Sequence, residues 1–205
     1  GLFRFGAIYK KDVNNQLNYN ISGRFSNESR VENISSRVLS DITETQNATP
    51  YTINQDLSYF YTANEKNIFA LEVTHVLQDE DPFYIASLEN DPNNNDFADN
   101  DGFDDAAEDL GLDRTNLFYT LEQDRKVKTN QLDARLDYYY ILNGKSNLNF
   151  VAGTIASSQN FNSRFFQILD NGTQFNPDPE IDGIEDEQIT NDTQYNFTDL
   201  YAGAR

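Results

Sequence analysis

Two acidic segments contain the residues whose types and spacing could bind a metal ion. In the first, Gly183 stands at position 6 of a loop in which four carboxylates take relative positions 1, 3, 5 and 9: Asp178, Glu180, Asp182 and Asp186. Converging oxygen ligands and a glycine at the sharp turn are typical of the front of a calcium-binding loop. Position 12, where such loops carry a bidentate acid, is Ile189. The segment is therefore a candidate Ca²⁺ site with an incomplete ligand pattern.

A second acidic cluster matches the same pattern less well, because Phe97 stands at its first ligand position. Its candidate ligands are Asp99, Asp101 and Asp105. Asp and Gly are common in turns of any kind, so an ordinary solvated loop is the competing interpretation of both segments. At the end of this cluster, residues 104–110 are predicted to form a short helix after an aspartate cap, with Ala107 and Leu110 buried beneath the loop.

Nothing in the sequence indicates an enzyme or a nucleic-acid-binding protein. There is no cysteine and His75 is the only histidine, so neither a thiolate nucleophile nor a zinc site with two histidines can form. No nucleophile accompanies the paired carboxylates. The formal net charge of -19 disfavours binding to a phosphate backbone, which requires clustered Lys and Arg. Residues 78–125 and 167–193 carry about -13 and about -8, so the rest of the chain is nearly neutral, at about +2.

The elements that must position these loops are predicted to be β-strands. Odd positions in residues 17–25 are apolar or glycine and even positions are polar, and residues 132–142 alternate in a similar way. A period of two collects the apolar side chains on one face of a pleated strand. We predict strands at residues 2–9, 16–26, 51–61, 68–77, 127–142, 147–158 and 194–204.

The connections between these strands alternate in length. Asn143-Gly144 is a strong hairpin signal, and short turns are predicted near residues 10–15, 62–67 and 143–146. Long external loops are predicted at 27–50, 78–126 and 159–193. In an up-and-down sheet this alternation places all short turns at one rim and all long loops at the other, as in outer-membrane barrels. We therefore predict an all-β fold, an antiparallel up-and-down transmembrane β-barrel, present as a partial barrel of about seven strands within one domain, residues 1–205.

The two faces of such a barrel differ in chemistry. The polar face is predicted to line the lumen, and its charged members are Arg24, Asp56, Glu72, Asp133, Arg135 and Asp137. The last three are about 6.5–7 Å apart along one strand, so they either pair with one another or select a solute. His75 is expected on the opposite, lipid-contacting face. Aromatic residues before two short turns fit an interfacial girdle: Tyr59, Phe60, Tyr61, Tyr138, Tyr139 and Tyr140.

The Tyr- and Asn-rich strand 17–25, the Tyr-rich strand before Asn143-Gly144 and the closing residues 200–205 resemble the barrel of outer-membrane TonB-dependent receptors. The resemblance implies a location in the Gram-negative outer membrane and uptake of a solute through a barrel of about 22 strands that is closed by a plug. It also implies the partners: outer-membrane lipid, the remainder of the barrel with its plug, a TonB-type energy-transducing protein and a surface lipoprotein. Besides Ca²⁺ in the external loops, no cofactor is expected.

Several alternatives stay open on the sequence alone. Seven strands is an odd number, whereas single-chain bacterial barrels have an even number, so we expect about a third of a larger barrel. A complete eight-stranded barrel is the competing count. The opening residues lack the basic and apolar regions of a signal peptide. In other classes, the chain would be a non-transporting surface β-protein whose calcium loops serve adhesion or assembly, or a soluble β-sandwich binding module.

Overall fold

A single antiparallel sheet accounts for nearly all of the part of the chain that the structure describes. The computed structural model describes residues 1–35, 41–89, 103–178 and 190–205. The strands are β1 (Leu2–Asp12), β2 (Asn15–Phe25), β3 (Glu28–Ile34), β4 (Ile42–Ala48), β5 (Tyr51–Asn64), β6 (Asn67–Glu80), β7 (Phe83–Glu89), β8 (Phe118–Asn143), β9 (Ser146–Ile168), β10 (Gln174–Phe175) and β11 (Asn191–Ala204). The one helix among these residues is α1 (Asp104–Asp109). The sheet is curled into about half of a barrel, which confirms the predicted fold class.

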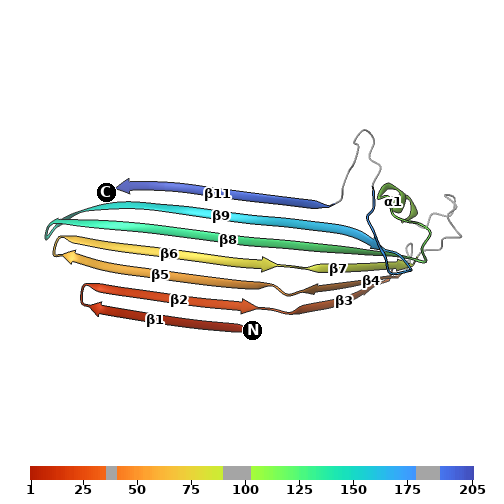
Figure 1. Cartoon of the computed structure of the whole chain (residues 1–205), viewed down its shortest axis with the longest axis horizontal. Helices are drawn as coiled ribbons and strands as arrows, with labels where there is room; N and C mark the ends of the chain where they lie inside the picture. The colour runs from red at the N-terminus through yellow and green to blue at the C-terminus, as the bar shows by residue number, and fades with distance from the viewer. Residues whose placement is uncertain (36–40, 90–102, 179–189) are drawn as a thin grey trace.

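Three pairs of strands follow one another along nearly the same line, namely β2 and β3, β4 and β5, and β6 and β7 (Figure 1). Pro50 and Pro82 stand at two of the three breaks, where a residue without an N–H interrupts the ladder. The breaks are linked laterally, because the backbone N–H and hydroxyl of Thr49 donate to the Asp81 carboxylate at 2.9 and 2.8 Å. The sheet therefore consists of seven long strands in up-and-down order.

The seven long strands include every predicted strand, but they extend much further away from the short turns than predicted. The range 27–50 contains β3 and β4, the range 78–126 contains β7 and the start of β8, and the range 159–193 contains the end of β9 and β10. The predicted long loops are therefore partly wrong: much of their length is sheet. Figure 1 shows the short turns at one end of the sheet and α1 at the other.

Register is regular across the long strands. β8 pairs with both β6 and β7 on one side and with β9 on the other, and its only register shift there lies beside the terminal turn, between Ile141 and Asn143. Alternate residues of the whole sheet can therefore be assigned to two faces. None of the described residues forms a helix with the length and hydropathy needed to cross a bilayer.

Candidate functional site

One face of the sheet, called here the apolar face, carries a band of apolar and aromatic side chains. The band spans nine residues in each of five strands, at 17–25, 53–61, 69–77, 132–140 and 148–156. Within the described residues no second sheet covers this face. Phe5 is 59% exposed, Leu136 44% and Leu200 76%. The alternative of a sandwich with a dry centre therefore does not describe this sheet.

The band runs obliquely to the strands. Its centres are Ile21 in β2, Leu57 in β5, Val73 in β6, Leu136 in β8 and Ala152 in β9. Ile21 pairs with Gln55, two residues short of the β5 centre, and Val73 pairs with Ala134, two residues short of the β8 centre. The centres face each other directly between β5 and β6 and between β8 and β9. The band thus moves on average one residue per strand, always towards the short turns.

The shift of the band by one residue per strand gives the strand tilt, which is the angle between the strands and the normal to the band. One residue advances about 3.4 Å along a strand, and neighbouring strands lie about 4.8 Å apart, so the tilt is about 35°. Nine residues cover about 27 Å along the strand, which at this tilt is a band about 22 Å tall.

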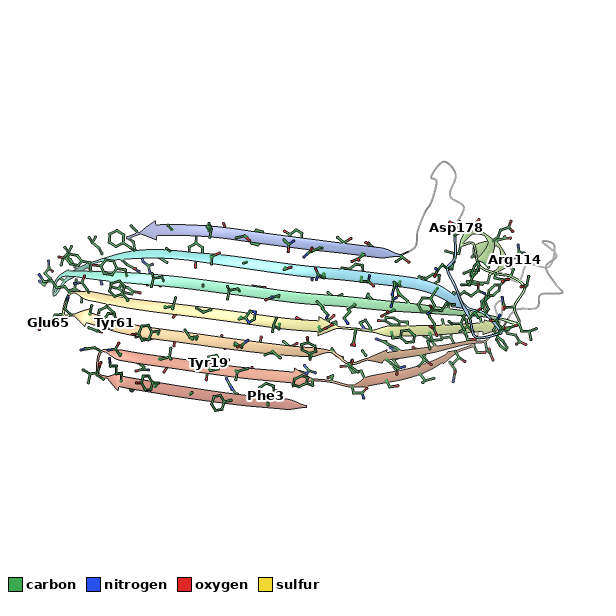
Figure 2. The ribbon with its side chains drawn as sticks, viewed as in Figure 1. Phe3, Tyr19, Tyr61, Glu65, Arg114 and Asp178 are labelled. Atoms are coloured by element: carbon green, nitrogen blue, oxygen red, sulfur yellow. The ribbon has the colours of Figure 1, made fainter. Side chains whose placement is uncertain are left out.

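Stacked aromatic rings mark the two borders of the band. Near the breaks in the strands, Phe25 stacks on Phe3 at a centroid distance of 6.0 Å and on Tyr51 at 6.1 Å. Near the short turns a longer row joins four strands at 4.8–6.5 Å: Tyr59, Tyr61, Phe69, Tyr138 and Phe150. Figure 2 shows Tyr61 close to the short turns and Phe3 further along the sheet, away from them. The sequence predicted Tyr59, Tyr61 and Tyr138 as members of a girdle, whereas Phe60 and Tyr139 alternate onto the opposite face.

The opposite face, called here the polar face, carries all six charged residues that were predicted to line a lumen. Arg24, Asp56 and Glu72 lie on β2, β5 and β6, and the other three lie on β8, where Arg135 is paired in register with Glu72. Arg135 donates to both carboxylate oxygens of Asp137, from Nε at 2.7 Å and from Nη2 at 2.9 Å. The structure therefore supports mutual pairing for these two residues, while Arg24 lies far along the sheet from them.

Asp137 is held by more than its arginine. It is 4% exposed, and Nδ2 of the buried Asn149 donates to Oδ1 of Asp137 at 3.3 Å. Asp56 lies further from the short turns and accepts a hydrogen bond from the Thr74 hydroxyl at 3.2 Å. The hydrogen bonds that join Arg135, Asp137 and Asn149 link β8 to β9 on the polar face. They make Arg135 and Asp137 a fixed ion pair rather than two free charges.

His75 lies on the apolar face, as predicted, and takes part in a hydrogen-bonded chain across four strands. The Tyr19 hydroxyl donates to Gln55 Oε1 at 2.8 Å, and Gln55 Nε2 lies 3.1 Å from His75 Nδ1. His75 Nε2 lies 2.8 Å from Asn130 Oδ1. Because the amide nitrogen of Gln55 can only donate, Nδ1 accepts and the imidazole proton lies on Nε2. The four side chains thus form one continuous chain of hydrogen bonds across the apolar face.

Residues 103–117, called here the cap, pack on the polar face at the end far from the short turns. Ala107 and Leu112 form a core with Leu88 and Tyr119, and Phe103, Leu110 and Leu121 pack around it. Tyr119 and Leu121 belong to the same alternating set of β8 as Arg135, which places the cap on the polar face. α1 confirms the predicted helix, and Ala107 is buried as predicted, whereas Leu110 is only half-buried. The N-cap of α1 is Phe103 without a side-chain hydrogen bond, so the expected aspartate cap is wrong.

Side-chain amides hold the cap on β9. Gln167 is fully buried; its Oε1 accepts from the Asp113 N–H at 2.8 Å and its Nε2 donates to the Asp113 carbonyl at 2.9 Å. Asp170 and the segment 116–117 are joined reciprocally, through Leu117 N–H to Asp170 Oδ2 and Asp170 N–H to Asn116 Oδ1. None of these residues was predicted from the sequence as part of a site. The available signal was one amide, Gln167, inside the apolar run 165–169.

Two carboxyl groups near the cap have shifted pKa values. The Thr115 hydroxyl, followed by the Thr115 N–H, donates to Asp113 and lowers the pKa of this carboxyl below its ordinary 3.8. Glu122 lies on the apolar side of β8, between Ile85 and Phe166 in register, and burial raises its pKa.

The candidate calcium ligands are only partly within the described residues. Asp178 and Asp105 are described, whereas Glu180, Asp182, Asp186, Asp99 and Asp101 lie outside the described residues. In the described ranges, no group of three or more His, Asp or Glu side chains is arranged to hold a metal ion. The calcium interpretation of both loops stays a prediction.

The geometry defines a class: an antiparallel, up-and-down partial barrel with one apolar and one polar face. No protein-family model matches the chain, and no curated protein or solved structure shows a significant match to it.

Proposed function

We propose that this chain is part of an outer-membrane β-barrel that takes up a solute, of the kind formed by TonB-dependent receptors. The observation that carries the proposal is the oblique apolar band. Transmembrane barrels have strands tilted by about 35–45° and an outward apolar band about 25 Å tall. The tilt of about 35° and the height of about 22 Å derived from the register agree with both values.

The aromatic borders support the same assignment. Tyr, Phe and Trp gather at both membrane–water interfaces, where an apolar ring and a polar edge suit the headgroup region. The two stacked rows lie at the two limits of the band and nowhere in its middle, among the ring pairs of the described residues. In this orientation the short turns face the periplasm, and the cap stands on the external side.

The polar face would then line the lumen, and two of its features suit passage of a solute through a filled barrel. The fixed pair of Arg135 and Asp137 keeps charge on the wall without an isolated ion. The cap packs onto this same face, so a solute entering from outside meets the cap before it meets the wall. The narrower assignment, to a TonB-dependent receptor with a plug, rests on the sequence resemblance.

Selective lipid labelling tests the membrane assignment. Single cysteines at Leu132 and Leu136 should react with a lipid-soluble maleimide in the intact outer membrane, and cysteines at Gln131 and Asp133 should not react with this reagent. These pairs alternate on the same strand, so they differ in face and hardly in depth. Equal labelling of both pairs by the water-soluble reagent would refute the membrane band.

The transporter assignment needs a separate test, because a surface barrel without a plug would give the same labelling. In a TonB-dependent receptor the lumen is filled, so a cysteine at Asp133 should be protected from water-soluble maleimide in the intact protein. Removal of the N-terminal plug domain should expose it. Free access in the intact protein would instead favour a non-transporting surface barrel.

A further inference from the structure

The sequence contains two Asn-Gly pairs, Asn143-Gly144 and Asn171-Gly172, and both lie at turns. An asparagine followed by glycine can lose its side-chain amide, because the backbone nitrogen of the glycine can attack the side-chain carbonyl carbon and no Cβ hinders its approach. All four residues are exposed, so exposure does not distinguish the two pairs. The hydrogen bonds of the two turns do distinguish them.

Both asparagine side chains have the same local geometry. The Lys145 N–H donates to Asn143 Oδ1 at 2.9 Å, and the Thr173 N–H donates to Asn171 Oδ1 at the same distance. A hydrogen bond from the second residue onward folds the side chain over the peptide group between them, as in an Asx-turn. The asparagine Cγ is therefore held close to the glycine nitrogen. The same N–H can stabilise the negative charge that develops on Oδ1 during attack.

The two glycine nitrogens differ in their hydrogen bonds. The Gly172 N–H donates to the Leu169 carbonyl at 2.7 Å, whereas the Gly144 N–H has no acceptor within the part of the chain that the structure describes. The nitrogen attacks only after its proton has been removed, and a proton held by a carbonyl is less accessible to base. The bond to Leu169 also fixes the orientation of the peptide group of Gly172. The nitrogen is thus free to react at Gly144 and is held at Gly172.

We propose that Asn143 is a site of spontaneous deamidation in the folded protein and that folding protects Asn171. Base removes the Gly144 N–H proton, the nitrogen forms a bond to Asn143 Cγ, and the Cγ–Nδ2 bond breaks to release ammonia. Water then opens the five-membered imide at either of its two C–N bonds, which gives aspartate or isoaspartate. Overall one water molecule is consumed and one ammonia is released, and nothing is oxidised or reduced.

The reaction changes the turn between β8 and β9 in two ways. Either product adds one negative charge two residues before Lys145, and isoaspartate also adds one carbon to the backbone between residues 143 and 144. Asn143 pairs with Ser146 at the end of the ladder, next to its register shift, so the longer backbone falls where the pairing is already irregular. This inference is independent of the proposed function, since it depends only on the geometry of one turn.

Incubation of the intact folded protein at mildly alkaline pH, followed by peptide mapping with mass spectrometry, tests the inference. Asn143 should deamidate at least about tenfold faster than Asn171, because the hydrogen bond that must break at Gly172 corresponds to roughly this factor in rate. In concentrated urea, where neither turn persists, the two rates should become similar. Similar rates in the folded protein, or protection of Asn143 by folding, would overturn the inference.

Two variants test the role of the Gly144 nitrogen. Gly144 lies outside the left-handed region, and a Cβ there would meet no heavy atom within 4 Å, so Gly144→Ala should keep the turn. The added Cβ hinders the attack, and deamidation of Asn143 should slow at least about tenfold. Ser146→Ala, in the same turn, leaves both reacting groups in place and should deamidate as wild type does. An unchanged rate in Gly144→Ala would show that water attacks the amide directly and would overturn the role of this nitrogen.

Discussion

Gln167 is the side chain on which the position of the cap depends most directly. Its amide makes both available hydrogen bonds to the backbone of Asp113 in a fully buried place. In Gln167→Leu, the N–H and carbonyl of Asp113 would lose their partners, at a cost of about 1–3 kcal/mol. We expect faster amide hydrogen exchange across residues 103–117, with exchange in β5 and β6 unchanged. Gln194→Leu, at an exposed position on β11, is the control. Unaltered protection of the cap would show that its apolar core suffices.

The ionised carboxylate of Asp113 makes the stability of the cap depend on pH. Its pKa in the folded protein is lower than the ordinary 3.8, so the stabilisation is fully present above about pH 4 and is lost as the pH falls through the lowered pKa. Exchange protection of the cap, corrected for the intrinsic rate, should stay constant from pH 7 to about pH 4 and decrease below that. Asp113→Asn should abolish this decrease. A decrease already at pH 5–6 in wild type would point to a different group.

At the scale of strands, Gly153 on β9 leaves room for the Tyr201 ring of β11. A Cβ at Gly153 would lie 2.3 Å from Tyr201 Cζ and 2.8 Å from the Ala134 carbonyl oxygen, so the tyrosine ring covers the glycine. Gly153→Ala should displace the ring and lower the stability of the sheet by about 1–3 kcal/mol. Gly203→Ala is the matched control on the neighbouring strand, because its Cβ would meet only Val151 Cγ1 at 3.3 Å. The temperature at which the heat-modifiable gel band shifts would measure both. Equal shifts would contradict the role of the Tyr201 contact.

The strands that cross the apolar band could be predicted from sequence because one of their faces is uniformly apolar. The outer parts of the same strands could not. In Glu122-Gln123-Asp124 both faces of β8 are polar, and an acidic stretch without alternation is typical of a loop. There the ladder to β7 and β9 makes the segment a strand, and those partners are about 40 residues away in sequence.

The candidate site was predictable to a similar extent. Alternation assigned the charged residues of the polar face, including Arg135 and Asp137, to one side. It did not reveal that the two form a closed pair, since only coordinates give their contact. The contacts of Gln167 depend on a cap more than 50 residues earlier in the chain. These contacts depend on the strand register and on the packing of the cap, and neither can be predicted from the local sequence.

For the whole molecule, strand direction constrains how the half-barrel is completed. β1 and β11 are the two free edges in the part of the described sheet that carries the apolar band, and both run towards the short-turn end. Two strands that run the same way cannot pair antiparallel, so a barrel that is antiparallel throughout would need an odd number of further strands between them. In the proposed membrane barrel an open edge would leave backbone groups unpaired in lipid, so we expect such strands to close it.

Disulfide trapping tests this closure. Phe5 and Ile21 are neighbours in register across β1 and β2, so a Phe5→Cys/Ile21→Cys pair should crosslink in the membrane. A Phe5→Cys/Leu200→Cys pair should not, because further strands separate β1 from β11. An efficient crosslink of the second pair would demonstrate a closed seven-stranded barrel with one parallel seam, and would remove the need for a larger barrel.

β8 runs without a break from Phe118 to Asn143, while three neighbouring long strands are interrupted. If Leu132 marks the outer limit of lipid, the remaining fourteen residues reach about 46 Å along the strand and about 38 Å above the bilayer at the derived tilt. The outer parts of β8 and β9 pair with each other and form a stiff two-stranded extension, and the cap packs at the end of this extension. In the proposed outer-membrane orientation, antibodies and phage fibres, too large to enter a pore, would touch that tip first, so immune and viral pressure should fall on the cap rather than on the wall of the lumen.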